Sequence, residues 1–279
     1  MDQKLKSKLE VTAIYLIIAI MTIIIFYPLL WTLGMSLNQG TSLYSSSIIP
    51  ENFSLEHYKW LFSENSDYLI WYKNSLIVST VVAFGSVVLT SLIAYAFSRY
   101  QFVGKKNGLY VFLLLQMFPV MMAMVALYIF LNMIGLLDTL AGLILIYLGG
   151  QIPFNAWLVK GYFDTIPREL DQAARIDGAG HLRVFWSIML PLAKPILAVV
   201  ALFNFMMPMF DFLLPSIVLN SEENFTLAVG LFNFINDQFS NNFTRFAAGS
   251  VLVAVPIAAI YLFLQRYLIS GLTAGGSKG

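Results

Sequence analysis

Residues 167–191 read PRELDQAARIDGAGHLRVFWSIMLP and form the longest charged interlude between the apolar segments of the chain. Pro167 suits the first turn of a helix, because the amide hydrogen that proline lacks has no helical partner there. Glu169 and Asp171 follow in that first turn, where negative charge complements the positive end of the helix dipole. The pattern therefore predicts a short helix that begins at the start of this stretch.

The end of this helix is also marked. Gly178 is typical of a helix C-terminus, and Gly180 permits a sharp reversal of the chain. A second short helix, Leu182–Met189, is predicted to lead through Pro191 into the next apolar segment. Four residues share one face of the first helix by their spacing: Leu170, Ala173, Ala174 and Asp177. The two alanines keep that face small, so that another protein surface can approach it closely.

The composition excludes a soluble globular enzyme. Of the 279 residues, 59% are hydrophobic and 11% are charged, whereas soluble domains carry about 25% charged residues. Several uncharged runs exceed the ~18 residues that indicate a membrane-spanning helix. Because backbone groups in lipid must be hydrogen-bonded internally, runs of this length predict helices.

The chain is predicted to be an all-α membrane protein with six transmembrane helices in a single permease domain, residues 1–279. The approximate spans are 11–35, 75–97, 108–132, 139–159, 194–212 and 246–266. Pro119 predicts a kink in the third span. A loop at 160–193 separates the fourth and fifth spans, and loops at 38–73 and 213–245 lie on the other side of the membrane.

Positive charge predicts the orientation of the chain. Six spans place both termini and the 160–193 loop on one side of the membrane, which holds 13 of the 16 Lys and Arg residues, against 3 on the other side. Cytoplasmic loops carry an excess of Lys and Arg. Both termini are therefore predicted to be cytoplasmic.

Signals for chemistry are weak. The chain has no cysteine, which excludes disulfides and thiolate metal sites. His57 and His181 lie far apart in the sequence and are predicted to be ordinary solvated side chains. The zinc-protease pattern HExxH does not occur. The tail from Gly271 resembles a P-loop, but Ser277 stands where that motif requires lysine. We therefore predict no catalytic residue, no metal and no cofactor.

The charged stretch carries a family resemblance. Gln172-Ala173-Ala174, then Gly178 after three residues and Ile188-Met189-Leu190-Pro191 after nine, resembles the EAA loop of bacterial ABC importer permeases, E-A-A-x3-G-x9-I-x-L-P. The resemblance continues in NSLIVS (74–79), AFSRYQFVGK (96–105), ARIDGAG (174–180), TLAVGL (226–231) and QRYLISGLTAGGSKG (265–279). It is strongest to the second, shorter permease of maltose/maltodextrin-type sugar importers.

This resemblance implies the type I ABC importer permease architecture in the bacterial cell membrane. It implies a heterodimer with a second permease, two copies of a cytoplasmic ATPase that hydrolyses ATP, and an extracytoplasmic sugar-binding protein. Membrane lipid is the remaining partner, and nucleic acid is not one. By position, the ATPase-coupling residues would be Gln172, Ala173, Ala174, Asp177 and Gly178, with Glu169 or Asp171 supplying a nearby charge. The motif begins with glutamate, and Gln172 replaces a charge-assisted contact with a neutral one about half as strong.

The polar residues inside the spans can be interpreted in two ways. These residues are Gln116, Asn132, Gln151, Asn155, Asn204 and Asp211. They would line a hydrated sugar path, or they would form hydrogen bonds between helices. No substrate-contacting residue is assigned. The alternative functions are an ion-coupled secondary sugar transporter and the same permease type for a different oligosaccharide. Ion coupling requires paired acids or basic residues within the membrane, and Asp211 is the only acid inside a run.

Overall fold

A computed structural model describes residues 3–41, 48–236 and 241–276. The described residues are predominantly helical and contain no strand, only an isolated antiparallel bridge between Asn38 and Phe53. The prediction of an all-α chain is confirmed.

The chain divides into two compact units. One unit contains Met1–Tyr68 and Leu231–Ala254, and the other contains Leu69–Gly230 and Val255–Gly279. Helices α12, Leu227–Asn233, and α13, Phe243–Gly276, run from one unit into the other, and the first residue of α3, Tyr68–Arg99, also belongs to the first unit. The assignment of residues 1–279 to a single permease domain stays a prediction.

The first unit contains helix α1, Gln3–Ser36, helix α2, Glu56–Leu61, and the first part of α13. No residue in the most apolar window of α1 is buried. The hydroxyl of Thr32 donates a hydrogen bond of 2.9 Å to the carbonyl of Pro28 within the helix. An exposed apolar surface with internally bonded polar groups is typical of a helix that faces lipid.

The prediction that His57 is a solvated side chain is wrong, because His57 is only 3% exposed. It lies on α2 beside Glu56, whose carboxylate oxygen Oε1 is 3.6 Å from Nε2 of the imidazole. In the same unit, the guanidinium of Arg245 lies 3.5 Å above the ring of Trp60. Burial lowers the pKa of His57, an effect that Arg245 reinforces and Glu56 opposes.

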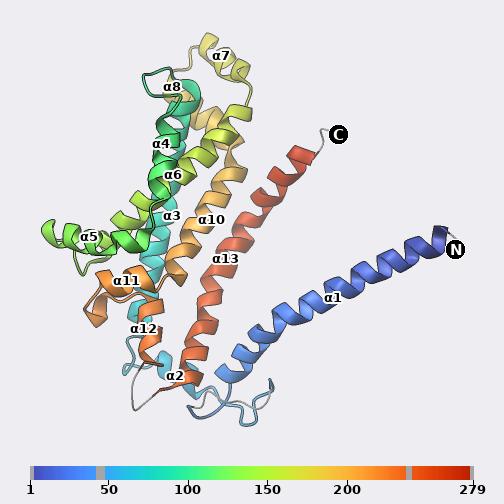
Figure 1. Ribbon diagram of the computed structural model, residues 1–279, viewed down its shortest axis with the longest axis vertical. Coiled ribbons are helices and arrows are strands. Elements are labelled where there is room, and N and C mark those ends of the chain that lie inside the picture. Colours follow the sequence, from blue (N-terminus) through green and yellow to red (C-terminus); the bar gives the residue numbers. More distant parts are fainter. Residues whose placement is uncertain (1–2, 42–47, 237–240, 277–279) are drawn as a thin grey trace. The chain divides into compact units, whose positions relative to one another are not determined.

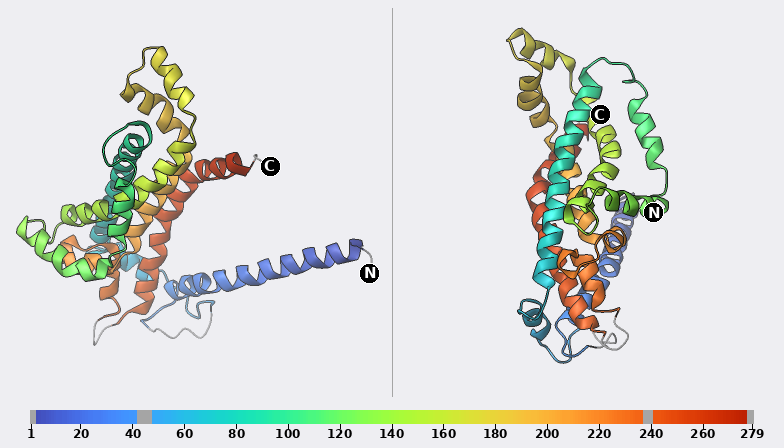
Figure 2. Two further views of the ribbon diagram at one scale, coloured as in Figure 1. Left: turned by 45° about the horizontal axis from the view of Figure 1, so that its top comes forward. Right: turned by 90° about the vertical axis from the view of Figure 1, so that its left-hand side faces the viewer.

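The second unit is a helical bundle. Helices α3 (Tyr68–Arg99), α6 (Leu140–Thr165) and α10 (Lys194–Phe210) run side by side (Figures 1 and 2). The part of α13 beyond Val255 packs on α10 through Leu264, which is buried with Ala198 and Leu202. A second cluster joins Val78 and Val82 of α3 to residues of α6 and of α11, Leu213–Val218.

Pro119 breaks the third predicted span into α4, Gly108–Gln116, and α5, Val120–Met133. The two helices are bent by 101°. The predicted kink is therefore a full break, because proline lacks the amide hydrogen that would continue the helical ladder. Helix α4 packs along α6, and α5 packs against α11.

Among the described residues, four helices are long and apolar enough to cross a membrane: Glu10–Ser36, Tyr68–Arg99, Leu140–Thr165 and Phe243–Tyr267. Two bent helix pairs, Gly108–Gln116 with Met121–Met133 and His181–Leu192 with Lys194–Phe210, raise the number to six if each pair is one span. These six overlap the six predicted spans in order. The side of the membrane on which the termini lie stays a prediction.

Candidate functional site

Between α6 and α10 the chain folds into a series of short helices, which we call the α7–α9 segment (residues 167–192). It contains α7, Arg168–Ile176, and α8, His181–Val184, followed by a π-helical turn, Phe185–Met189, and α9, Leu190–Leu192. The segment lies at one end of the second unit (Figure 1). The predicted second helix is present, but half of it is π-helical.

A glycine cap ends α7. Gly178 has a positive φ of 85°, its amide donates to the carbonyl of Arg175 at 3.1 Å, and the amide of Ala179 donates to the carbonyl of Ala174 at 2.9 Å. This pair of hydrogen bonds is the Schellman motif. The predicted role of Gly178 as the helix terminator is confirmed, and the reversal that follows brings α8 back toward the bundle.

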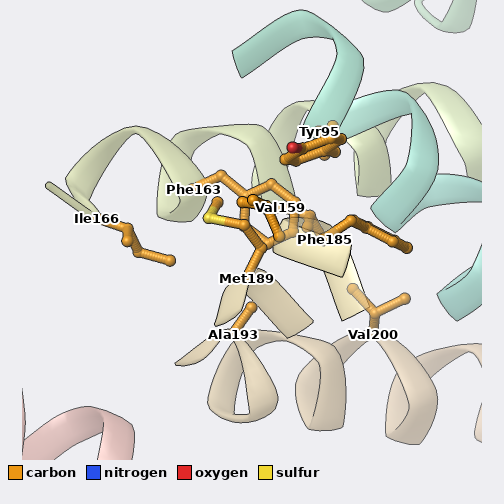
Figure 3. Packing of buried hydrophobic residues seen from close by; sticks show 10 residues of the cluster. Tyr95, Val159, Phe163, Ile166, Phe185, Met189, Ala193 and Val200 are labelled. Carbon is orange, nitrogen blue, oxygen red and sulfur yellow. The ribbon is translucent and has the colours of Figure 1, made fainter. Parts of the chain in front are cut away.

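An apolar cluster fastens the α7–α9 segment to the bundle. Tyr95 of α3, Phe163 of α6, and Phe185 and Met189 of the π-helical turn point toward one another in this cluster (Figure 3). Ala174 and Ala179, on the two sides of the glycine cap, pack against it. The side chains thus join the segment to three membrane helices, because Val200 of α10 is also a member.

A buried ion pair connects α7 to the end of α3. Nε of Arg99 lies 2.5 Å from Oδ2 of Asp171, and the two side chains are 6% and 14% exposed. The same guanidinium donates through Nη2 to the carbonyl of Ile166, the residue that ends α6, at 2.9 Å. One arginine therefore contacts two helices besides its own.

The neighbouring residue of α3 joins the same polar group. Ser98 donates a hydrogen bond of 2.7 Å from Oγ to Oδ1 of Asp164 on α6. The other oxygen of Asp164 lies 2.6 Å from Nζ of Lys160, one helical turn earlier. The backbone carbonyl of Ser98 accepts a hydrogen bond of 3.3 Å from Nη2 of Arg168, at the start of α7.

A cavity of about 190 Å³ lies beneath α7. Eight residues line it: Tyr95, Arg99, Arg168, Asp171, Gln172, Arg175, His181 and Val184. Since Asp171 neutralises Arg99, the positive charges of Arg168 and Arg175 dominate the lining. The contact between α7 and the bundle is therefore open and polar on this side.

Five of the six predicted coupling residues are exposed: Glu169, Gln172, Ala173, Asp177 and Gly178. Ala174 is half-buried and turns toward the bundle, so the predicted common face of α7 is divided between solvent and the apolar cluster. Large apolar side chains join the exposed set. Ile176 is 86% exposed, Leu182 72% and Trp186 61%.

Sequence reasoning did not find the residues that anchor this segment. Arg99 and Ser98 lie in the quoted stretch AFSRYQFVGK, and Asp171 is predicted only to complement the helix dipole and to offer a charge near the docking residues. The signal that was available is a strongly polar Ser-Arg pair directly after an apolar run. Its partners lie far away in the sequence, and only the fold brings them together.

Polar residues within the bundle bind one another. Asn204 of α10 accepts hydrogen bonds at Oδ1 from Ser86 Oγ of α3, at 3.0 Å, and from Asn155 Nδ2 of α6, at 3.2 Å. All three side chains are buried. Between other helices, the amide of Gln116 donates to the carbonyl of Gly150, and the hydroxyl of Tyr147 donates to Asp211 at 2.8 Å. This arrangement favours interhelical bonding over a sugar path for these residues.

The opposite end of the second unit is also fastened by polar contacts. Asp138 accepts hydrogen bonds from the backbone amides of Asn220 and Ser221, at 2.8 and 3.1 Å. The indole of Trp71, near the start of α3, donates to the carbonyl of Glu222 at 3.0 Å. Burial alone would raise the pKa of Asp138, but these hydrogen bonds and that from the Ser221 hydroxyl together lower it.

Within residues 3–41, 48–236 and 241–276, no group of three or more His, Cys, Asp or Glu residues could hold a metal ion. The glycine-rich tail continues α13 as far as Gly276. The part of the P-loop-like sequence that begins at Ser277 lies outside the described residues.

A bundle of apolar helices with a fastened but exposed helical segment at one end is the architecture of a polytopic membrane protein. The chain belongs to the family described as "Binding-protein-dependent transport system inner membrane component", whose model matches residues 86–273. It is thus a membrane permease of the ABC importer class, and the predicted family is confirmed.

Relatives resemble the chain over its whole length. It is 47% identical over 280 residues to the galactooligosaccharides transport system permease protein GanQ of Bacillus subtilis, with coverage of 100% of this chain and 99% of that protein. It is 48% identical over 265 residues to the maltodextrin transport system permease protein MdxG of the same organism, with 95% of each chain covered. The maltose/maltodextrin permease MalG of Escherichia coli K12 is 38% identical over 292 residues, which cover 98% of this chain and 97% of MalG.

Solved structures share the fold. A bacterial ABC transporter involved in the import of the acidic polysaccharide alginate superposes with a TM-score of 0.81 at 24% identity, over 96% of this chain and 98% of that chain. A bacterial alginate ABC transporter in complex with an alginate pentasaccharide-bound periplasmic protein gives a TM-score of 0.71 at 18% identity, over 95% of each chain.

Proposed function

We propose that this chain is the permease subunit that conducts an uncharged oligosaccharide through the membrane in an ATP-driven importer. Its partners are a second permease, two copies of a cytoplasmic ATPase and an external sugar-binding protein. The observation that carries the proposal is the α7–α9 segment. Its outer surface is exposed, and its inner surface is fastened to three membrane helices by an apolar cluster and a buried ion pair.

The exposed surface of this segment has the properties of a docking site for another protein. Ile176, Leu182 and Trp186 are large apolar side chains that are mostly exposed on a charged segment. Exposed apolar residues surrounded by polar ones mark protein interaction sites, and a short amphipathic helix commonly binds in a partner's groove. We assign Glu169, Gln172, Ala173, Asp177 and Gly178 to the contact with the ATPase, and Ala174 to the support beneath it.

Positive charge supports a cytoplasmic position for this end of the second unit. Eight basic residues belong to the α7–α9 segment or to the adjoining ends of helices and loops: Arg99, Lys105, Lys106, Lys160, Arg168, Arg175, Arg183 and Lys194. Such an excess is typical of cytoplasmic loops. With six spans, both termini lie on the same side.

In the proposed importer this chain catalyses no reaction, and the partner ATPase hydrolyses ATP. Maltodextrins are the expected substrates, and galactooligosaccharides are the alternative because relatives of both kinds are similar to this chain. An ion-coupled mechanism would need a proton- or sodium-binding acid in the membrane. Asp211, the acid considered for that role, instead accepts hydrogen bonds from Tyr147 and from the amide of Leu213.

The test is uptake into vesicles that contain this chain, its partner permease and the ATPase, with the binding protein added outside. ATP inside the vesicles should drive uptake of labelled maltodextrin or galactooligosaccharide, and an ATPase-inactive importer should take up neither. Uptake that is driven by an ion gradient without ATP would contradict the proposal. The same assay with each sugar separates the two substrate classes.

A further inference from the structure

The α7–α9 segment raises the question of how movement at its surface reaches the membrane helices. We propose that Arg99 and Asp171 form the link that transmits movement of α7 into α3. The inference rests on the proposed function, because it takes α7 as the element that the ATPase moves. Arg99 is a positioning residue in this mechanism, since it contacts neither sugar nor nucleotide.

The ion pair of Arg99 and Asp171 joins α7 directly to the end of α3. Asp171 lies in the first turn of α7, whereas Arg99 is the last residue of α3. The 2.5 Å contact joins a buried arginine to a partly buried aspartate, whose side chains are 6% and 14% exposed, so the charges are partly shielded from water. The contact is an ion pair rather than an aligned hydrogen bond, since Nε of Arg99 has no hydrogen-bond partner. Displacement of α7 therefore pulls directly on the end of a helix of 32 residues.

Several helical elements meet at Arg99. Besides Asp171, its guanidinium binds the carbonyl of Ile166 at 2.9 Å and lies 3.5 Å from the sulfur of Met189 in the π-helical turn. Arg168, at the start of α7, binds the carbonyl of Ser98. Two residues of α7, Arg168 and Asp171, thus contact the last two residues of α3, Ser98 and Arg99. The guanidinium of Arg99 also contacts the end of α6 and the π-helical turn.

The packing around the ion pair is not continuous. No residue of α7 is fully buried, and the cavity of about 190 Å³ lies between α7 and the bundle. Oδ1 of Asp171 is buried and has no hydrogen-bond partner. Because continuous packing is absent on this side, force on the start of α7 reaches α3 through polar contacts, which are the ion pair and the hydrogen bond from Arg168 to the carbonyl of Ser98. The apolar contacts of Ala174 and Ala179 act at the far end of α7.

A role restricted to stability would give a different result from a role in transmission. Loss of stability would reduce the amount of assembled importer, and uptake and ATP hydrolysis would fall in proportion. Loss of transmission would leave the ATPase bound and active while fewer sugar molecules enter for each ATP hydrolysed. The ratio of uptake to hydrolysis, measured on assembled importer, separates the two.

The experiment compares Asp171→Asn and Arg99→Gln with the native chain in vesicles that contain the complete importer. We expect the ATPase to co-purify at native levels and uptake per ATP to fall about tenfold or more. The charge-exchanged double variant Arg99→Asp with Asp171→Arg should recover part of that ratio. Lys160→Gln is the matched control, because it breaks an ion pair at the same end of the unit but within a single helix.

The nearly isosteric Asp171→Asn decides the outcome if Arg99→Gln does not accumulate. A native ratio of uptake to hydrolysis in Asp171→Asn would overturn the proposal, as would an equal loss in Lys160→Gln. Loss of the ATPase from the purified variant would also overturn it, since the pair would then serve assembly. If the native chain itself retains no ATPase, the proposed function fails rather than the link.

Discussion

The hydroxyl of Ser86 on α3 donates a hydrogen bond of 3.0 Å to Oδ1 of Asn204 on α10. Both side chains are fully or almost fully buried. The amide of Asn155 on α6 donates to the same oxygen, and the amide of Asn204 donates to the carbonyl of Val200 at 2.8 Å. A single side chain therefore joins three helices of the second unit, which explains why an amide is placed in an apolar core.

Replacing Asn204 by leucine should destabilise the protein by about 1–2 kcal/mol, because Ser86 and Asn155 lose the acceptor that they share. The measurement is unfolding in mild detergent. Asn132→Leu is the control, since Asn132 is exposed on α5. Equal effects of the two substitutions would show that the shared acceptor contributes nothing specific.

Gly178→Ala should weaken the end of α7. The new side chain meets open space, so the cost is that of a positive φ for a residue with a Cβ, about 1–2 kcal/mol. We expect less ATPase to co-purify with the variant. Gly161→Ala is a suitable control, because Gly161 lies within α6 and also faces open space. Undiminished ATPase binding by Gly178→Ala would contradict the role assigned to this cap.

Gln172→Glu should strengthen ATPase binding. A hydrogen bond to a charged group contributes about 1 kcal/mol more than a neutral one, which corresponds to a roughly fivefold lower dissociation constant. The affinity of the ATPase for the permease pair in detergent measures this. Gln101→Glu adds the same charge to an exposed residue outside α7 and should change little. A weaker complex with Gln172→Glu would mean that the facing ATPase surface is not basic.

His57 should make the first unit sensitive to acid. Burial lowers its pKa below the usual 6.5, so protonation favours the unfolded chain. Stability contributed by neutral His57 is fully present above pH ~6.5 and is lost as the pH falls toward the folded-state pKa, by at most about 1.4 kcal/mol per pH unit.

The groups that face this imidazole are Glu56 of α2 and Arg245 of α13. His57→Phe should therefore flatten the dependence of the unfolding temperature on pH between 7 and 5. His181→Gln serves as the control substitution. The same acid sensitivity in native protein and in His57→Phe would exclude His57 as its source.

Topology can be tested directly, because the chain has no cysteine. Single cysteines at Glu64 and at Lys106 are predicted to lie on opposite sides of the membrane. A membrane-impermeant thiol reagent added to intact cells should label Glu64→Cys and leave Lys106→Cys unmodified until the cells are opened. The reverse pattern would place both termini outside.

Much of the fold follows from local sequence. Uncharged runs mark the membrane helices, Pro119 ends α4, and Gly178 ends α7, because each of these effects depends on adjacent residues. The break at Pro119 was predicted as a kink, since sequence alone does not show how far the two halves diverge.

The anchoring of the site depends on contacts between distant residues. Asp171 meets Arg99 only after α3, α6 and the α7–α9 segment have packed, so its pattern in the sequence indicates a helix start and a charge near the docking residues, but not its partner. For the same reason, Ala174 and Ala173 look equivalent in the sequence, although one supports the helix and the other is exposed. His57 looked solvated because α2 is short and polar, and the fold buries it.

The central claim is that the exposed surface of α7 docks on the ATPase and moves with it. The most direct measurement is cross-linking from Ala173→Cys in this cysteine-free chain to a single cysteine in the helix-binding cleft of the ATPase, with Leu114→Cys on α4 as the control. We predict that Ala173→Cys alone forms the cross-link, and that uptake stops until a reductant is added. Absence of any cross-link from Ala173→Cys in an importer that transports sugar would contradict the account.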